Sequence, residues 1–218
     1  MVQTIVHDLA TQLRRDIALG ILSPGQRLNI EALKRERGVS HPSIREALSL
    51  LVGEGYVTVE GNKGYRVLES SLEDLHDTTR LRAELECIGF AWSMQRATPD
   101  WRGRVVAAHH TLSEIEAEMG GNLRDFVIEW DERNKQFHSA LIGNCGSPRL
   151  IETVSTLYDL TRRYRLMAYS DVSNDRPKWL ERSPKEHNDL KAAALVGDIE
   201  AGVRIMREHI TKSFVMGL

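Results

Sequence analysis

The first 68 residues place two helical segments around a glycine turn and follow them directly with two short alternating strands. Residues 30–37 form the first segment, and Gly38 ends it, because glycine readily adopts the left-handed C-cap conformation. Ser40 and Pro42 then begin the second helix as N-cap and first-turn residue. The run YVTVEGNKGYRVLE alternates apolar and polar residues on both sides of a glycine turn. This order predicts a helix-turn-helix with a β-hairpin wing.

From Ser71 onward the strand signals stop, and the sequence indicates helices separated by breaks rich in turn and capping residues. Ser71 and Asp74 resemble a capping box at the start of the first of these helices. We expect helices at about 71–97, 99–119, 123–143, 147–170, 183–196 and 198–216. The predicted fold is mainly α, with a winged helix-turn-helix domain at residues 1–68 and an all-α antiparallel bundle at residues 71–218.

Charge and composition exclude several classes of protein. The net charge of −2 excludes a globally basic nucleic-acid binder. Residues 1–68 hold nine Lys/Arg against seven Asp/Glu, so DNA binding must depend on where individual charges lie. No run of about 18 uncharged apolar residues occurs, and the N-terminus does not resemble a signal peptide. We therefore expect a cytoplasmic protein that does not bind membranes. Two cysteines are too few for a disulfide framework.

The predicted second helix of the helix-turn-helix carries candidate contacts to double-stranded DNA. In this motif the second helix enters the major groove, and its first turn meets the base edges. Arg45 lies in that turn and can bind guanine with two hydrogen bonds or contact phosphate. A lone arginine is equally often a solvated surface charge, but the order of the elements favours DNA. The other candidate contacts are Arg35, Ser40, His41, Ser43 and, at the wing tip, Lys63.

The segment NKQFHSALIGNCG places two polar residues, Asn134 and His138, inside the apolar stripe of a predicted helix. Their spacing of four makes both side chains project toward the same point. A lone histidine on such a face is more often a hydrogen-bonded core residue. However, His187 and His209 occur on later predicted helices, and three imidazoles with one amide oxygen could close around a divalent ion that keeps open positions. Spacing alone does not fix which helices meet.

The segments LSPGQRL, HPSIREALSLLVGEGYV and NKGYRV resemble the winged-helix domain of the GntR family of bacterial transcription regulators. The resemblance implies a sequence-specific DNA-binding protein in which Arg35 and Arg45 contact DNA and Lys63 with Gly64 forms the wing. His41 stands where that family usually has arginine, so the resemblance does not carry the usual base contact over to this position.

The segments FHSALIGNCGSPRL, EHNDLKAAALVGD and MREHI resemble the all-helical effector-binding domain of the FadR subfamily, in which a carboxylate and three histidines hold a metal. The resemblance implies that His138, His187 and His209 are ligands and that Asn134 occupies the usual aspartate position. Asp131, one turn earlier, is an alternative fourth ligand. We expect zinc first, because neutral imidazoles suit it, with nickel and manganese as alternatives.

In that subfamily the effector is typically a small organic acid, and dicarboxylates are among the candidates. Arg82, in the segment LRAELE, matches an arginine that often faces the effector pocket, and its guanidinium fork suits a carboxylate. The alternative for Arg82 is a surface salt bridge with Glu86, four residues later.

These features favour a ligand-responsive transcription regulator, expected to be a repressor and not an enzyme. A homodimer would bind a pseudo-palindromic operator through two winged helices. The first alternative is a metal-dependent hydrolase that uses the three histidines, with Glu186 as base. Glu186 adjoins His187, however, and neighbouring residues on a helix point about 100° apart. The second alternative is a structural or metal-free bundle with the winged helix as an interaction module.

Overall fold

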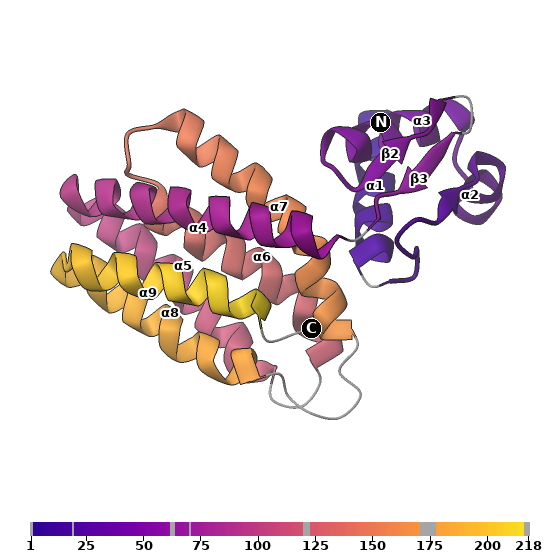
Figure 1. The fold of residues 1–218 in the computed structure, drawn as a ribbon. Coiled ribbons are helices and arrows are strands. Elements are labelled where there is room, and N and C mark those ends of the chain that lie inside the picture. Colours follow the sequence, from indigo (N-terminus) through magenta and orange to yellow (C-terminus); the bar gives the residue numbers. More distant parts are fainter. Residues whose placement is uncertain are drawn as a thin grey trace.

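The protein folds into a winged-helix domain and a helical bundle that are joined by a short linker (Figure 1). This computed structural model confirms the expected mainly α fold. The structure describes residues 2–18, 20–61, 64–69, 71–119, 123–170 and 178–215.

The N-terminal domain packs three helices against a small antiparallel sheet. Its elements are α1 (Val2–Ala18), β1 (Arg27–Leu28), α2 (Ile30–Arg37), α3 (His41–Gly53), β2 (Val57–Val59) and β3 (Tyr65–Val67). The strand order is β1-β3-β2, with Leu28 opposite Tyr65 and Val57 opposite Val67. The sequence indicated β2 and β3 but not β1, because two residues are too short to show an alternating pattern.

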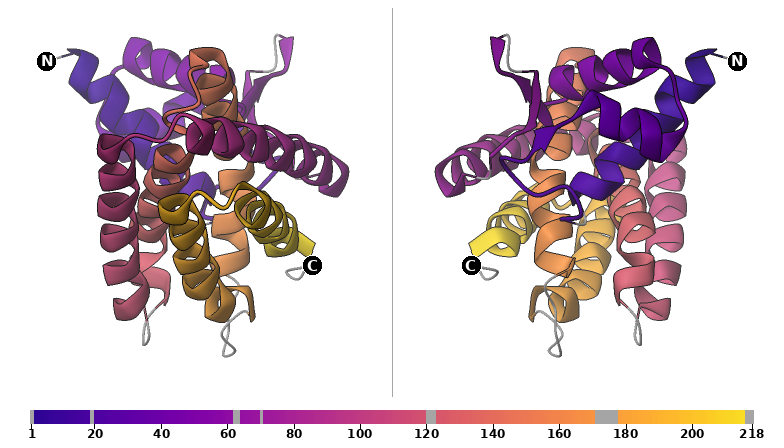
Figure 2. Two further views of the ribbon diagram at one scale, coloured as in Figure 1. Left: turned by 90° about the vertical axis from the view of Figure 1, so that its left-hand side faces the viewer. Right: turned by 90° about the vertical axis from the view of Figure 1, so that its right-hand side faces the viewer.

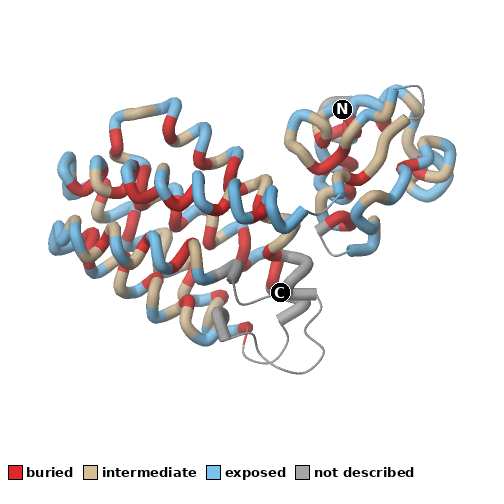
Figure 3. The backbone as a smooth tube through the Cα atoms, viewed as in Figure 1, coloured by how far each residue is buried: buried red, intermediate tan, exposed pale blue. Residues whose placement is uncertain are grey.

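The two helices of the helix-turn-helix begin and end where the sequence predicts. Gly38 adopts φ 64° and donates its N–H to the Lys34 carbonyl, which ends α2. Ser40 caps α3, and its Oγ accepts a hydrogen bond from the Ser43 N–H at 3.3 Å. The inner face of α3 is fully buried against α1 (Figure 3). The residues that form this core include Leu9, Leu13, Ile44, Ala47, Leu48 and Leu51.

The C-terminal domain is a bundle of long helices. They are α4 (Leu72–Gln95), α5 (Pro99–Glu118), α6 (Leu123–Ile142), α7 (Pro148–Ser170), α8 (Lys178–Val196) and α9 (Ile199–Val215). Helix α4 packs against α6, α7 and α9, while α5 packs against α6 and α8 (Figure 2). The apolar core includes the fully buried side chains of Phe90, Trp101, Phe137 and Leu141.

Helix α8 begins earlier than expected. It starts at Lys178 and continues through Pro184, whereas the sequence suggested a start at residue 183. Proline is common in a first turn, which makes it a misleading start signal here. An interior proline removes one backbone hydrogen bond. Burial of Ser183 and His187 on both sides of it holds the helix together in spite of that loss.

Two expectations about the chain as a whole can be compared with the structure. Among the described residues, no helix is both long enough and apolar enough to cross a membrane. Cys87 and Cys145 are free thiols, and both are buried.

Helix α7 forms the contact between the two domains. The Tyr56 hydroxyl of the winged-helix domain lies 3.4 Å from the Asp159 carbonyl oxygen, to which it donates. Beside it, the Leu160 side chain lies against Gly55 so closely that a Cβ atom there would be 2.4 Å from Leu160 Cδ2. Helix α7 therefore touches the winged-helix domain directly while its other face lies in the bundle core.

Candidate metal centre and nucleic-acid interface

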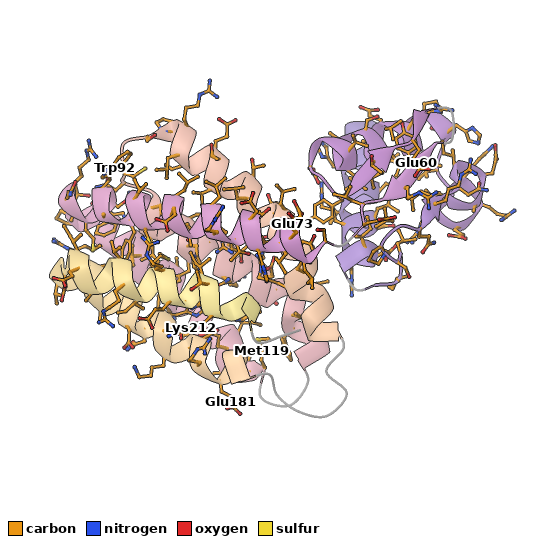
Figure 4. The ribbon with its side chains drawn as sticks, in the orientation of Figure 1. Glu60, Glu73, Trp92, Met119, Glu181 and Lys212 are labelled. Carbon is orange, nitrogen blue, oxygen red and sulfur yellow. The ribbon has the colours of Figure 1, made fainter. Side chains whose placement is uncertain are left out.

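Arg35 and Arg45 lie exposed on the helix-turn-helix, where they could contact DNA. Other arginines of this domain are engaged internally, since Arg14 pairs with Glu54 and Arg66 pairs with Glu60. Among the residues that the structure describes, neither Arg35 nor Arg45 has an ion-pair partner, and Figure 4 shows the side chains of this domain. Two exposed, unpaired guanidinium groups beside the turn are suited to phosphate and base contacts.

The other predicted DNA contacts are placed differently. Ser43 is only 9% exposed, and its hydroxyl lies 2.9 Å from the Ser40 hydroxyl, so both groups take part in capping α3. His41 is half-buried, with Nε2 3.0 Å from a Glu31 carboxylate oxygen. Gly64 adopts φ 92°, a left-handed conformation that the wing turn requires. Lys63 lies outside the described residues.

Three histidines from three helices meet in the bundle core. His138 is on α6, His187 on α8 and His209 on α9, and each is at most 5% exposed. One ligand atom from each lies within 4.8 Å of the others. The Nε2 atoms of His187 and His209 lie 3.3 Å apart. The tertiary structure therefore brings together the three histidines that the sequence suggested.

A carboxylate holds the Nδ1 atom of each of these histidines. Glu86 lies 2.5 Å from His138 Nδ1, Glu116 lies 2.7 Å from His187 Nδ1, and Glu186 lies 2.7 Å from His209 Nδ1. A carboxylate accepts only, so each imidazole carries its proton on Nδ1 and leaves a lone pair on Nε2. This arrangement is typical of metal-ligating histidines, whose second nitrogen is fixed by a carboxylate.

The sequence did not indicate these three roles of glutamate. Glu86 was expected only as a partner of Arg82, and Glu186 only as a base. Glu116 carried no signal, because it lies 71 residues from His187 in the chain. The signal that could have indicated Glu116 is an ionisable residue on the inner face of a predicted helix.

Burial and charge set the protonation states around the histidines. Burial lowers the pKa of His138, and it lowers the pKa of His209 to about 3. Burial alone would raise the pKa of Glu86, but Arg82 and His138 outweigh it and lower that pKa to about 2. Neutral imidazoles beside an ionised carboxylate are the forms that bind a divalent cation.

Asn134 lies one turn before His138 and is 4% exposed. Its Nδ2 donates to the Tyr158 hydroxyl at 2.9 Å. Its Oδ1 is buried and has no hydrogen-bond partner among the described residues, and the same holds for His138 Nε2. Buried acceptors without partners are costly, so two in adjacent turns fit a bound cation.

Asp131, the alternative fourth ligand, is neutralised within the protein. Its carboxylate lies 2.8 Å from Arg165 Nε and 2.7 Å from Arg162 Nε. Two arginines on one buried carboxylate leave little charge for a metal, so Asn134 fits the ligand set better.

Arg82 forms the salt bridge with Glu86 that the sequence allowed, but in the interior of the bundle and not at the surface. Its Nε lies 2.5 Å from Glu86, as the salt-bridge alternative states, but the side chain is 3% exposed and lies inside the bundle. Its guanidinium also stacks on the Tyr158 ring, 4.4 Å from the centroid. The two terminal NH₂ groups of Arg82 have no hydrogen-bond partner among the described residues.

Comparison with known proteins decides the family. Residues 6–67 match the model for bacterial regulatory proteins of the gntR family, and residues 77–212 match the FCD domain. The chain belongs to the GntR family. It combines the family's helix-turn-helix domain with an FCD domain, as the resemblance to FadR-type regulators implied. It is therefore a transcription regulator and not an enzyme.

Known relatives match this chain over nearly its whole length. It is 34% identical to the HTH-type transcriptional regulator BphR of Paraburkholderia xenovorans, covering 97% of this chain and 84% of that protein. It is also 34% identical to the HTH-type transcriptional repressor GlaR of Escherichia coli, and this match covers 91% of this chain and 89% of that protein. The solved structure of E. coli McbR/YncC has the same fold, with a TM-score of 0.73 at 22% identity over 95% and 94% of the two chains.

The hydrolase alternative has no support in this GntR protein. Glu186, the expected base, lies 2.7 Å from His209 Nδ1 and 2.6 Å from Arg182 Nε. Both carboxylate oxygens are occupied, so this group orients a histidine instead of activating water. The related proteins are regulators.

Proposed function

We propose that this regulator is a dimeric repressor whose bundle holds a divalent metal and releases DNA when a small organic acid binds there. One observation carries the proposal. The Nε2 atoms of His187 and His209 face each other at 3.3 Å while both Nδ1 atoms are held by carboxylates. Two lone pairs at that distance repel unless a cation lies between them. Nitrogen ligands of tetrahedral zinc, with bonds of about 2.0–2.1 Å, lie roughly 3.3 Å apart.

The proposed ligands are His138, His187, His209 and the Asn134 carbonyl oxygen. Three neutral imidazoles favour zinc, and nickel or manganese are the alternatives. Asn134 brings no charge of its own, but Glu86, Glu116 and Glu186 supply negative charge through the histidines that they hold. These residues therefore form a binding site for a divalent ion whose charge would attract an anionic effector.

We propose that the effector is a small organic acid, with dicarboxylates included. A carboxylate at the metal would lie near Arg82, whose terminal NH₂ groups can bind it. The side chain is held in place by Glu86 and by the ring of Tyr158. Similarity to the repressor GlaR supports repression, and not activation, as the mode of regulation.

Helix α7 offers a route from the acid to DNA. Tyr158 and Arg165 face the bundle core, while Asp159 and Leu160 contact the winged-helix domain. A ligand that shifts α7 would therefore also move the winged-helix domain, and the recognition helix α3 with it, which is what coupling between two sites requires.

A homodimer would place two winged helices on a pseudo-palindromic operator. The outer face of α4 supports this assembly, because Leu81, Ile88 and Trp92 lie on one side of the helix and are 48%, 39% and 40% exposed. Figure 4 shows Trp92 at the end of α4 far from the winged-helix domain. A stripe of large exposed apolar residues is typical of an interface.

The test is binding of the purified protein to promoter DNA by fluorescence anisotropy, across salt, with and without a panel of carboxylic acids. We expect a steep loss of affinity with salt and release by at least one acid. The double variant His138→Ala/His187→Ala should bind DNA, hold no metal by elemental analysis and fail to respond. His110→Ala is the matched control, because its side chain is 71% exposed on α5. Release of the double variant by the acid would contradict the metal's role.

A further inference from the structure

An asparagine ligand poses a problem that an aspartate does not. A carboxylate presents two equivalent oxygens, whereas an amide can bind a cation only through Oδ1. The two ends of an amide are nearly equal in size, so a half-turn of the side chain would aim Nδ2 at the metal instead. Asn134 therefore needs a neighbour that distinguishes its two ends.

The Tyr158 hydroxyl makes this distinction. It donates its single proton to Asp131, whose backbone oxygen lies 3.1 Å away and whose Oδ1 lies 3.4 Å away. Its oxygen is then left as an acceptor toward Asn134, which lies 2.9 Å away. An acceptor requires a donor, so Nδ2 must face Tyr158, and Oδ1 must face away from it.

The ring of Tyr158 is itself fixed. The side chain is 1% exposed. Guanidinium groups lie over the ring, that of Arg165 at 3.9 Å and that of Arg82 at 4.4 Å from its centroid. Each arginine is held in turn by a carboxylate, Arg165 by Asp131 and Arg82 by Glu86. The hydroxyl therefore has a defined position from which to orient the amide.

We propose that Tyr158 is a positioning residue that turns the Asn134 carbonyl oxygen to the metal by accepting the Nδ2 proton. This inference rests on the proposed metal centre, and it adds a residue that does not touch the metal. It also explains how an uncharged amide can act as a metal ligand. The orientation of the Asn134 side chain is fixed before the ion binds, so binding costs little conformational entropy at this residue.

The test is a double-mutant cycle on zinc affinity, measured by competition with a chromophoric chelator. The four proteins are the natural chain, Tyr158→Phe, Asn134→Asp and the double variant. We expect Tyr158→Phe to weaken zinc binding roughly tenfold when Asn134 is present. In the Asn134→Asp background, Tyr158→Phe should alter zinc affinity by less than about twofold, because either oxygen of the aspartate carboxylate can bind the ion. Equal losses in both backgrounds, or no loss in either, would overturn the inference.

Two further measurements separate positioning from folding. The visible spectrum of the cobalt-substituted protein should change with Tyr158→Phe only in the Asn134 background, because it reports the ligand atoms. Tyr164→Phe is the matched control on the same helix, since its hydroxyl bonds Ser71 instead of Asn134. It should leave zinc affinity unchanged. If the natural chain binds zinc no better than His138→Ala, the proposed metal centre itself fails, and this inference fails with it.

Discussion

Glu116 on α5 holds His187 on α8, with 2.7 Å between Oε1 and Nδ1 and 71 residues between them in the chain. The same oxygen accepts the indole N–H of Trp130 at 3.4 Å. This carboxylate therefore fixes the orientation of one proposed ligand while it is itself fixed by a third helix.

Glu116→Gln should weaken metal binding by about 10–100-fold, because an amide accepts less strongly than a carboxylate and donates less charge through the imidazole. The measurement is chelator competition with zinc. Glu114→Gln is the control, because that side chain is 62% exposed on the same helix. A comparable loss in the control would contradict a specific role for Glu116.

Arg45→Ala should weaken DNA binding by roughly 1–3 kcal/mol and relax the preference at one base pair of each half-site. The reason is that Arg45 is exposed near the start of α3 without an ion-pair partner among the described residues. Anisotropy titrations with the operator and with single-base variants measure both effects. Arg149→Ala, 92% exposed at the start of α7, should change neither. An unchanged operator preference would show that Arg45 contacts only phosphate.

Arg82→Lys should raise the acid concentration needed for half-release of DNA about tenfold or more, because lysine keeps the charge but loses the fork that binds a carboxylate. DNA affinity without acid should stay the same. The control is Arg80→Lys on the same helix, where the side chain is 80% exposed. If Arg82→Lys responds to the acid like the natural protein, Arg82 has only its structural role with Glu86.

Gly55→Ala should destabilise the protein more than Gly38→Ala. Both glycines have positive φ, 75° and 64°, which costs alanine roughly 1–2 kcal/mol. At Gly55 the new Cβ would also lie 2.4 Å from Leu160 Cδ2, whereas at Gly38 nothing lies within 4 Å. Because Leu160 Cδ2 ends a flexible side chain that can turn away, this overpacking adds a cost at the low end of the usual range, about 1 kcal/mol.

Denaturant unfolding measures the difference, and a cycle with Leu160→Ala isolates the contact. In that background Gly55→Ala should cost no more than Gly38→Ala. If Gly55→Ala in the Leu160→Ala background still lowers the free energy of unfolding more than Gly38→Ala does, the contact with Leu160 is not the cause.

Trp92→Glu should convert the proposed dimer to a monomer, because it would place an unpaired charge in the proposed apolar interface. Multi-angle light scattering gives the mass in solution. Val196→Glu, at the end of α8 and 78% exposed, is the control and should remain dimeric. A dimeric Trp92→Glu protein would place the interface elsewhere.

The helical boundaries followed from local signals because capping is a local interaction. Ser40, Gly38 and Ser71 each lie where the sequence predicted a cap, and their hydrogen bonds reach no more than four residues. The start of α8 could not be predicted in this way, since continuation through Pro184 depends on packing. Strand β1 was missed for a similar reason, because it exists only as a partner of β3.

The sequence by itself determined the mainly α fold, the helix-turn-helix and the helical face that Asn134 and His138 share, because spacing on a helix fixes which side chains share a face. His187 and His209 were added as proposed ligands by the resemblance to the FadR subfamily, since spacing does not fix which helices meet. Only the tertiary structure decided what surrounds those ligands. Glu86, Glu116 and Tyr158 reach them from 52, 71 and 24 residues away. Contacts at such separations depend on how whole helices pack, and no local pattern in the chain encodes them.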